Sequence, residues 1–430
     1  MFGPISNSQT GLQKTTTYKV VLPFYMYAAV SFLIATILLL LHTDIFSQHY
    51  FHPYTLAITH IMALGWGTMI ILGASHQLLP VLIEGKLDSD LLAYLTFVFT
   101  AIGIPFLVVG FYIFHVGWVL QTGAVLVNIG VLCYLSNVIS SIYESKKHDV
   151  HAWYMAVASI WLFVTTFFGL LLVFNFSTSF LPSDSVTYLS LHAHLGIIGW
   201  FLLLVVGVAS RLIPMFLISK YTNDKALWRI FILINAGLVS FIGFRWAMLS
   251  PLYYYVSLVL VLIGIVLFGK HCYHAYKVRI RKSVDEQMKI SLLSVGQMLL
   301  PVISLCVVLF FLPDNKGTSI SLLYGFCIFF GWLTAIILGM TFKTLPFIVW
   351  NRVYHERAYE GATPVPKELF SEKLFNSMSI AYLIGFILFA IGITLQSNIW
   401  LKSGAIALLV AAILYVFNTG ITIFHQPKKQ

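Results

Sequence analysis

The sequence predicts an all-α integral membrane protein with about twelve transmembrane helices in three pseudo-symmetric four-helix units. Three observations support this fold class. The 430-residue chain is 59% hydrophobic and only 9% charged, with a mean hydropathy of +0.91, a composition typical of membrane proteins. Its apolar residues form continuous runs that are long enough to cross a bilayer. Three of these runs share one sequence frame at regular spacing.

The transmembrane helices follow from the length of the apolar runs, because crossing the hydrocarbon core takes about 20 apolar residues. Hydropathy within each run is continuous and does not alternate, which indicates helices and not the strands of a barrel. The twelve runs lie near residues 18–41, 55–82, 91–112, 116–142, 152–175, 188–219, 228–248, 252–276, 288–312, 319–349, 374–396 and 399–424. We expect residues 1–430 to form a single transmembrane domain.

The second, sixth and tenth runs share a frame built on a Gly-Trp pair. In each run a glycine follows the tryptophan by seven residues and a proline follows it by fourteen. The three frames are Gly65-Trp66 with Gly73 and Pro80, Gly199-Trp200 with Gly207 and Pro214, and Gly331-Trp332 with Gly339 and Pro346. We interpret these residues as packing positions, where glycine lets the central helices approach closely.

The spacing of the frames defines the expected repeat. The tryptophans are separated by 134 and then 132 residues, which corresponds to four helices. We therefore expect repeat units near residues 18–142, 152–276 and 288–424. The second helix of each unit should line the interior, and the other nine should enclose it.

The net charge of +10 reflects membrane topology and does not indicate a nucleic-acid partner. Basic residues gather in every second loop, whereas Lys316, Lys402 and Arg245 are exceptions in the intervening loops. The positive-inside rule places both termini in the cytoplasm, and we expect a bacterial inner membrane. The basic loops hold Lys146-Lys147, Lys220 to Arg229, Lys270 to Lys289, Arg352 to Lys373 and Lys428-Lys429.

Three histidines are the main candidates for a cofactor site. His60 and His194 each precede the repeat tryptophan by six residues, and His192 lies close by. Ionisable residues in membrane helices indicate function when they face the interior, and neutral imidazole is a common ligand of haem iron. We expect His60 and His194 to hold one haem iron from both faces. His192, about 200° around the helix from His194, should face a second haem or metal. The alternative is that these histidines cap helix ends or lie among lipid headgroups.

Residues 192–214, HAHLGIIGWFLLLVVGVASRLIP, resemble the HxH helix of the haem-copper oxidase superfamily. The large subunit of that family, found in cytochrome c oxidase and nitric oxide reductase, also has twelve helices, arranged with pseudo-threefold symmetry in three arcs of four helices. His60, with the trailing LLPVLIEG, resembles the low-spin haem ligand of its second helix. The resemblance implies one or two b-type haems, a quinol or cytochrome c electron donor, and further membrane subunits.

The sequence also departs from the pattern of that family. The tenth run has Tyr324 and Phe326 in place of the HxH histidines, and the seventh run has no histidine for copper or non-haem iron. We therefore expect redox or diatomic gas chemistry, with nitric oxide or oxygen, without a complete binuclear centre. An oxidoreductase and a non-respiratory relative similar to the NnrS family both fit this expectation, and no catalytic residue is identified. The alternative is a twelve-span transporter without haem.

Several further residues are candidates for supporting roles. His76, Arg211 and Lys343 follow the repeat tryptophans by ten or eleven residues. They would pair with haem propionates or other anions, or extend to the headgroups. His115 and the first outer loop (His42, His49 and His52) lie at a depth suited to a metal site. The remaining histidines are expected in cytoplasmic loops: His148, His151, His271, His274, His355 and His425. The four isolated cysteines predict neither a disulfide nor a covalently attached haem.

Overall fold

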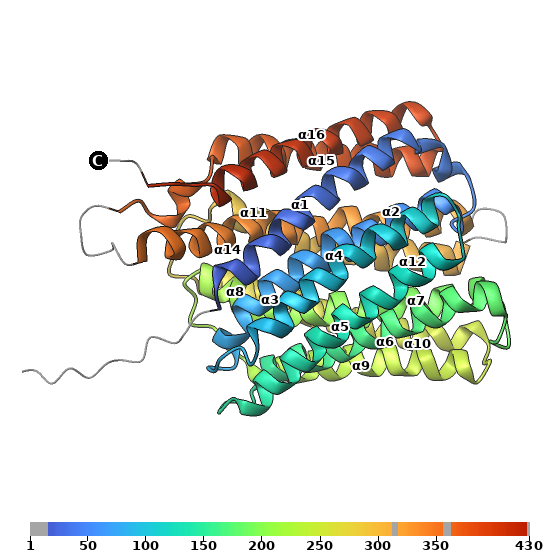
Figure 1. Ribbon diagram of the computed structural model, residues 1–430, viewed down its shortest axis with the longest axis horizontal. Coiled ribbons are helices and arrows are strands. Elements are labelled where there is room, and N and C mark those ends of the chain that lie inside the picture. Colours follow the sequence, from blue (N-terminus) through green and yellow to red (C-terminus); the bar gives the residue numbers. More distant parts are fainter. Residues whose placement is uncertain (1–15, 312–316, 356–362, 428–430) are drawn as a thin grey trace, which may run out of the picture.

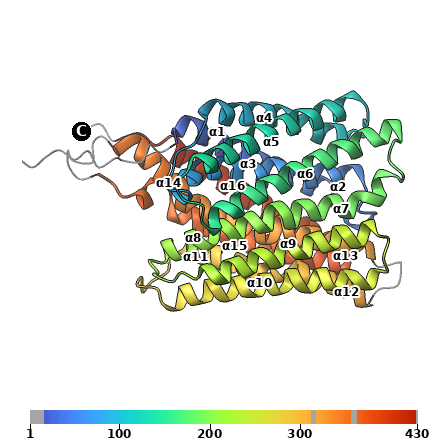
Figure 2. The same ribbon diagram turned by 90° about the horizontal axis from the view of Figure 1, so that it is seen from below.

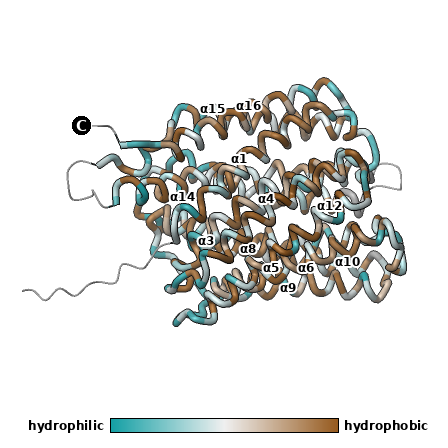
Figure 3. The backbone as a smooth tube through the Cα atoms, viewed as in Figure 1, coloured by the Kyte–Doolittle hydropathy of each residue, from teal (hydrophilic) through white to brown (hydrophobic). Residues whose placement is uncertain are grey.

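The computed structural model describes residues 16–311, 317–355 and 363–427. Within these ranges, twelve helices are long and apolar enough to cross a membrane, which confirms the predicted fold class. The helices run roughly parallel along the long axis of the molecule (Figure 1). Their apolar segments lie between more polar ends (Figure 3). Lys316 and Lys428-Lys429, which belong to the charge pattern above, lie outside the described residues.

The helices follow one another in three groups of four spans. The first group is α1 (Tyr18–Leu41), a composite helix of α2 (Pro53–His60), η2 (Ile61–Thr68) and α3 (Met69–Leu82), then α4 (Asp90–Tyr112) and α5 (Trp118–Glu144). The second is α6 (Val150–Thr178), a composite helix of α7 (Leu189–His194), η4 (Leu195–Leu202) and α8 (Leu203–Phe216), then α9 (Asp224–Trp246) and α10 (Tyr254–Lys277). The third is α11 (Glu286–Gln297) with α12 (Leu299–Phe311), a composite helix of α13 (Gly317–Phe326), η6 (Cys327–Leu333) and α14 (Thr334–Tyr354), then α15 (Glu372–Leu395) and α16 (Asn398–Ile423).

The three groups of spans pack against one another around the composite helices. The first helix of the chain, α1, packs against the last, α16, and α5 packs against α6. The beginning of α1 and the C-terminal end lie at the same end of the bundle (Figure 1). Helices α10 and α12 run side by side along one edge (Figure 2).

Each composite helix changes from α to π winding around its Gly-Trp pair. The π segments are η2, η4 and η6, and they cover equivalent positions in the three frames. In η6 the backbone departs further from helical geometry at Gly331, where φ is −89° and ψ is −111°. Short π segments are rare in proteins and frequently mark functional sites. Nothing in the apolar pattern of these runs predicts this change of winding.

The three tryptophans of the frames lie buried at the centre of the molecule. Trp66 Nε1–H donates to the Thr334 hydroxyl, and Trp200 Nε1–H donates to the Thr68 hydroxyl, both at 3.1 Å. Thr68 and Thr334 each stand two residues after a repeat tryptophan, whereas the second frame has Leu202 there. We name these four side chains the Trp-Thr pairs. They join the central helices of different units by the same contact.

The repeat glycines perform a different packing role from the one predicted. A Cβ atom at Gly207 would lie 2.4 Å from Tyr154 Cβ, and one at Gly73 would lie 2.7 Å from Phe24 Cβ. Tyr154 belongs to α6 and Phe24 to α1, the first helices of their own units. The prediction that these glycines bring the central helices together is therefore wrong. They bring the first helix of each unit against its second, because only glycine leaves room there.

Candidate functional site

A cavity of about 720 Å³ lies between the central helices, toward the end of the bundle that carries α2 and α7. Thr68 and Trp200 border it, so it adjoins the Trp-Thr pairs. All three composite helices contribute to its wall, together with α4, α5 and α6. The volume is in the range of about 300–1,000 Å³ that is usual for cofactor and small-molecule sites. We refer to this space as the central cavity.

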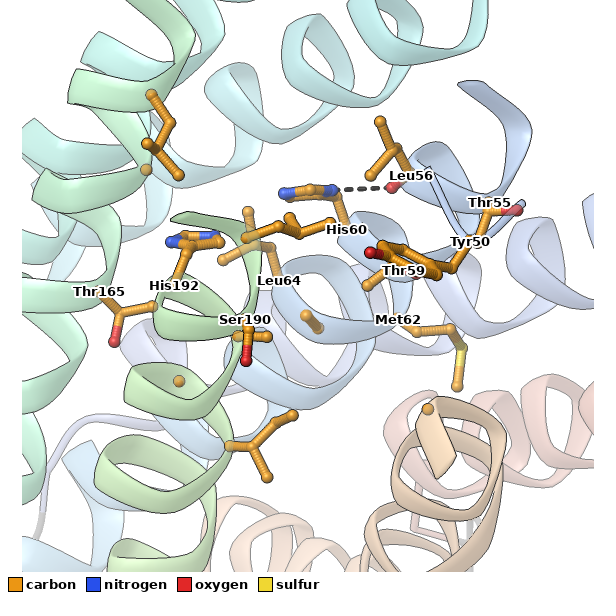
Figure 4. Close-up of a pocket in the computed structure, with 18 of the residues that line it drawn as sticks. Tyr50, Thr55, Leu56, Thr59, His60, Met62, Leu64, Thr165, Ser190 and His192 are labelled. Carbon is orange, nitrogen blue, oxygen red and sulfur yellow. Dashed lines mark hydrogen bonds between the residues drawn. The ribbon is translucent and has the colours of Figure 1, made fainter. Parts of the chain in front are cut away.

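His60 enters the central cavity from the end of α2. Its Nδ1–H donates to the Leu56 carbonyl oxygen, one turn earlier, at 2.7 Å. This hydrogen bond leaves Nε2 with a free lone pair, and Figure 4 shows that nitrogen on the side of the ring that faces His192. The Phe111 ring stacks on the imidazole with centroids 4.5 Å apart. The hydrogen bond therefore fixes the tautomer of His60, a feature that metal-binding histidines share.

His192 enters the same cavity from α7. Its ring is nearly parallel to that of His60, with an interplanar angle of 20° and ring centroids 6.4 Å apart. The imidazole lies against Gly169, where an added Cβ would come within 2.8 Å of His192 Cε1. Its Nδ1 is buried without a hydrogen-bond partner.

The spacing of the two rings suits a shared metal. An imidazole nitrogen binds a first-row metal such as zinc at about 2.0 Å, so two imidazoles on opposite sides of one ion have ring centroids about 6 Å apart. The observed 6.4 Å between His60 and His192 agrees with this distance. No other pair of histidines from two composite helices shows such a ring contact among the described residues.

His194 faces away from His60. Its Nδ1–H donates to the Ser190 carbonyl oxygen at 2.7 Å, and its Nε2 lies 3.2 Å from the Tyr324 hydroxyl. The ring also contacts Phe241 of α9. The structure therefore places His192, and not the predicted partner His194, opposite His60. His192 and His194 are two residues apart on one helix, so their side chains point in nearly opposite directions. The rotation of α7 within the bundle therefore decides which histidine faces the first unit.

Arg245 is the charged side chain at the central cavity, among the described residues that line it. Its Nη2–H donates to the Thr187 carbonyl oxygen at 2.6 Å, which holds the guanidinium near the end of α9. The sequence contained one signal for this residue, since Arg245 breaks the alternation of basic loops. Arg245 is half-buried, and its guanidinium is able to pair with a carboxylate of a bound molecule.

The cations predicted to pair with propionates lie elsewhere. Lys343 forms an ion pair with Asp285, which also lies 3.0 Å from Arg281. Arg211 is exposed, and neither cation lines the central cavity. Burial alone would raise the pKa of Asp285, but the Lys343 ammonium donates to the carboxylate and holds that pKa below its ordinary value. Lys343 is thus neutralised by the chain itself.

The predicted accessory histidines also lie away from the cavity. His76 is 1% exposed and packs against Phe24 and Tyr134, with no hydrogen-bond partner at either ring nitrogen. His115 is exposed beside Trp118. Neither residue is therefore placed to hold a group in the central cavity, whereas the predicted Tyr324 does line it.

The histidines of the first outer loop serve local structure. His42 Nε2 lies 3.1 Å from the Tyr112 hydroxyl, and burial lowers the pKa of His42. His52 accepts a hydrogen bond from the Tyr54 backbone N–H at 3.3 Å and caps α2. In the described part of the chain, no three His, Cys, Asp or Glu side chains converge as a metal site.

Two histidines expected in cytoplasmic loops are buried in helices. His151 Nδ1–H donates to the Gly207 carbonyl oxygen at 3.1 Å. His271, in α10, is 3% exposed and packs against the Tyr221 ring. The sequence prediction was wrong here because both lie next to basic segments, where helix ends and loops are hard to separate.

The fold and the cavity define the class of this protein as a twelve-span, all-α membrane protein with a histidine-lined central cavity. Comparison with known proteins adds no family to this description. No protein-family model matches the chain, and no curated protein matches it.

Proposed function

We propose that this protein binds one b-type haem in the central cavity and acts in redox chemistry, as a relative of the large subunit of haem-copper oxidases. The proposal depends on one observation. The rings of His60 and His192 lie nearly parallel, with centroids 6.4 Å apart, across a cavity of about 720 Å³. At this spacing His60 and His192 would be able to hold one iron between them.

The residues around the cavity fit such a group. The wall is mainly apolar, with Leu64, Phe111 and Phe329 among its residues, and would bury a macrocycle. The hydrogen bond from His60 to Leu56 leaves Nε2 free for a metal. Arg245 is the cation that would receive a propionate,.

Ligation by two histidines bears on the kind of chemistry. A haem held by both His60 and His192 would supply one-electron redox chemistry, with its protein ligands leaving little room for oxygen or nitric oxide. Of the two activities that the resemblance implies, we therefore favour electron transfer over gas binding at this position. The Phe111 ring stacks on the His60 imidazole and covers one face of it.

A twelve-span transporter without haem is also compatible with the architecture. In that case the central cavity would hold a transported substrate. The feature that favours haem is the orientation of the two imidazoles, since transport requires no parallel histidine pair. Bound haem in the purified protein separates the two functions directly.

The test is the visible spectrum of protein expressed with ample haem. We expect a Soret band and a low-spin, bis-histidine signature in near-infrared magnetic circular dichroism. His60→Ala and His192→Ala should each abolish that signature. His194→Ala should retain it, and His115→Ala serves as a matched control at the same end of the bundle. Protein without a Soret band, or an equal loss in His194→Ala, would refute the proposed ligand pair.

A further inference from the structure

The Trp-Thr pairs join two of the three seams between the units, the seam of the first with the third and the seam of the first with the second. Both pairs follow one cyclic order, in which the tryptophan of each unit donates to the threonine of a neighbour. The same order would link Trp332 of the third unit to residue 202 of the second. That residue is Leu202, whose side chain has no acceptor. The seam between the second and third units therefore lacks the hydrogen bond that joins the other two.

A second cavity, of about 250 Å³, lies at this seam. Leu202 and Trp332 both line it, together with residues of α7, α9, α10 and α12. The cavity thus lies where a third Trp-Thr pair would otherwise bring the two units together. We refer to this space as the seam cavity.

The seam cavity extends from one end of the bundle to about its middle. Along α10 its lining runs from Tyr254, the first residue of that helix, to Ile265. These residues are eleven positions apart, which corresponds to about 16 Å at a rise of about 1.5 Å per residue. The hydrocarbon core of a bilayer is about 30 Å thick. The cavity is therefore about as deep as one leaflet.

Polar side chains of the lining lie nearer the end of the bundle and are paired within the chain. The Tyr324 hydroxyl lies 3.2 Å from His194 Nε2, and the Ser257 hydroxyl lies 2.8 Å from that of Ser240. The deeper lining is largely aliphatic, with side chains from both units: Leu202, Val261, Ile265, Val302 and Ile328. Because unpaired polar groups are costly to bury, a ligand that fills the deeper part should be apolar.

One layer of helices separates the seam cavity from the bilayer. Helices α10 and α12 line the cavity and run along one edge of the bundle (Figure 2). Their other faces carry exposed apolar side chains, with Val256 at 50%, Val259 at 49% and Ile303 at 56% exposure. A molecule from the lipid therefore has only to pass between these two helices to reach the cavity.

We propose that the seam cavity binds the acyl chain of a membrane lipid, which enters between α10 and α12. The lipid belongs to the leaflet at the end of the bundle that carries α2 and α7. Its head group stays at the level of Tyr254, and its chain extends toward Leu202 and Trp332. The chain matches the cavity in length and in apolar character. It joins the second and third units by packing, where the other seams have a hydrogen bond. The inference uses no feature of the pair His60 and His192 and stands independently of haem.

The test is photolabelling of the protein in phosphatidylcholine liposomes, with a diazirine near the end of one acyl chain. Mass spectrometry should find the label inside the bundle, in η4 or η6, where Leu202 and Ile328 are 4% and 0% exposed. A phosphatidylcholine analogue with the diazirine in its head group should label neither segment. If the chain probe labels only lipid-exposed residues such as Val259, the inference is overturned.

A matched pair of substitutions on α10 separates the cavity from the outer surface of the helix. Leu258→Trp places a large side chain in the cavity wall and should lower the internal labelling by about 10-fold through lost affinity. Val259→Trp adds the same side chain at the next residue, which is 49% exposed, and should leave the internal labelling unchanged. An equal effect of the two substitutions would contradict the proposed site.

Two substitutions at Leu202 test the role of the absent pair. Leu202→Thr supplies an acceptor for Trp332 and should lower the internal labelling by bringing the units together. Leu202→Val has almost the same shape without the hydroxyl and should retain it; equal labelling would refute the role of the absent pair. His60→Ala should label as the wild type does, so failure of the haem proposal leaves this result unaffected. All variants should first show an unchanged elution volume and helical circular dichroism spectrum.

Discussion

The hydrogen bond between Trp200 and Thr68 offers a quantitative test of how the units are joined. The donor and acceptor are 1% and 3% exposed and are 3.1 Å apart. Thr68→Val keeps the shape of the side chain but removes the acceptor, so the indole N–H is left buried without a partner. Trp200→Phe removes the donor together with part of the packing. A double-mutant cycle isolates the hydrogen bond from this packing loss.

The expected coupling follows from the burial of the pair. Hydrogen bonds between membrane helices average about 0.6 kcal/mol in such cycles and reach about 1.7 kcal/mol. Because both partners here are almost fully buried, we expect a coupling of about 1–1.7 kcal/mol. The free energy of unfolding would be measured by SDS titration in mixed micelles. Thr68→Ser, which retains the hydroxyl, is the control and should retain most of the stability.

The corresponding cycle on Trp66 and Thr334 should give a similar coupling, because its distance and burial match. A coupling of less than about 0.3 kcal/mol in the first cycle, within the usual limit of additivity, would refute the reasoning. Couplings that differ by more than about 1 kcal/mol between the two cycles would show that the shared sequence frame does not carry an equivalent interaction.

The remaining predictions concern charge. Lys343→Ala should lower the free energy of unfolding by less than the about 3–5 kcal/mol that an unpaired buried charge costs, because Arg281 remains 3.0 Å from Asp285. Lys343→Ala combined with Asp285→Asn should recover part of the loss, and no recovery would contradict the pairing. Asp285 has a depressed pKa, so its stabilisation is complete above its unfolded pKa of about 3.9 and is lost as the pH falls through the folded value. The acid unfolding curve of Asp285→Asn should accordingly be shallower than that of the wild type. NMR spectra of histidine-labelled protein should show His42 titrating with a pKa below about 6.5, because burial disfavours its cation. Comparison with Tyr112→Phe tests how the hydrogen bond between His42 and Tyr112 contributes to that pKa.

Much of the fold could be predicted from the sequence because its main determinants are local. A lipid environment requires each span to satisfy its own backbone hydrogen bonds, so continuous apolar runs identify the helices one by one. The twelve predicted runs agree with the twelve observed spans. The sequence frame around Trp66, Trp200 and Trp332 also showed which helices are related. It did not reveal the π winding at these positions, since that winding leaves the apolar pattern unchanged.

The candidate site could be predicted only in part. Residue type and depth in the membrane were enough to select His60, His192 and His194. Arg245 appeared in the sequence as an exception among basic loops, but its place at the cavity depends on how α9 packs against α7. Burial of His151 and His271 likewise depends on neighbouring helices and not on the sequence around them.

The sequence by itself determined the twelve helices, the relation between the second helices of the three units, and the three candidate histidines His60, His192 and His194. Hydropathy and sequence spacing are properties of the chain alone. Only the tertiary structure decided that His192, and not His194, faces His60. Side chains two residues apart on a helix point in nearly opposite directions, and the rotation of the helix is set by the helices that pack against it. A Cβ at Gly199 would lie 2.7 Å from Trp161 Cβ, so this contact lets α6 approach closely and contributes to the rotation that directs the two histidines to opposite sides of α7.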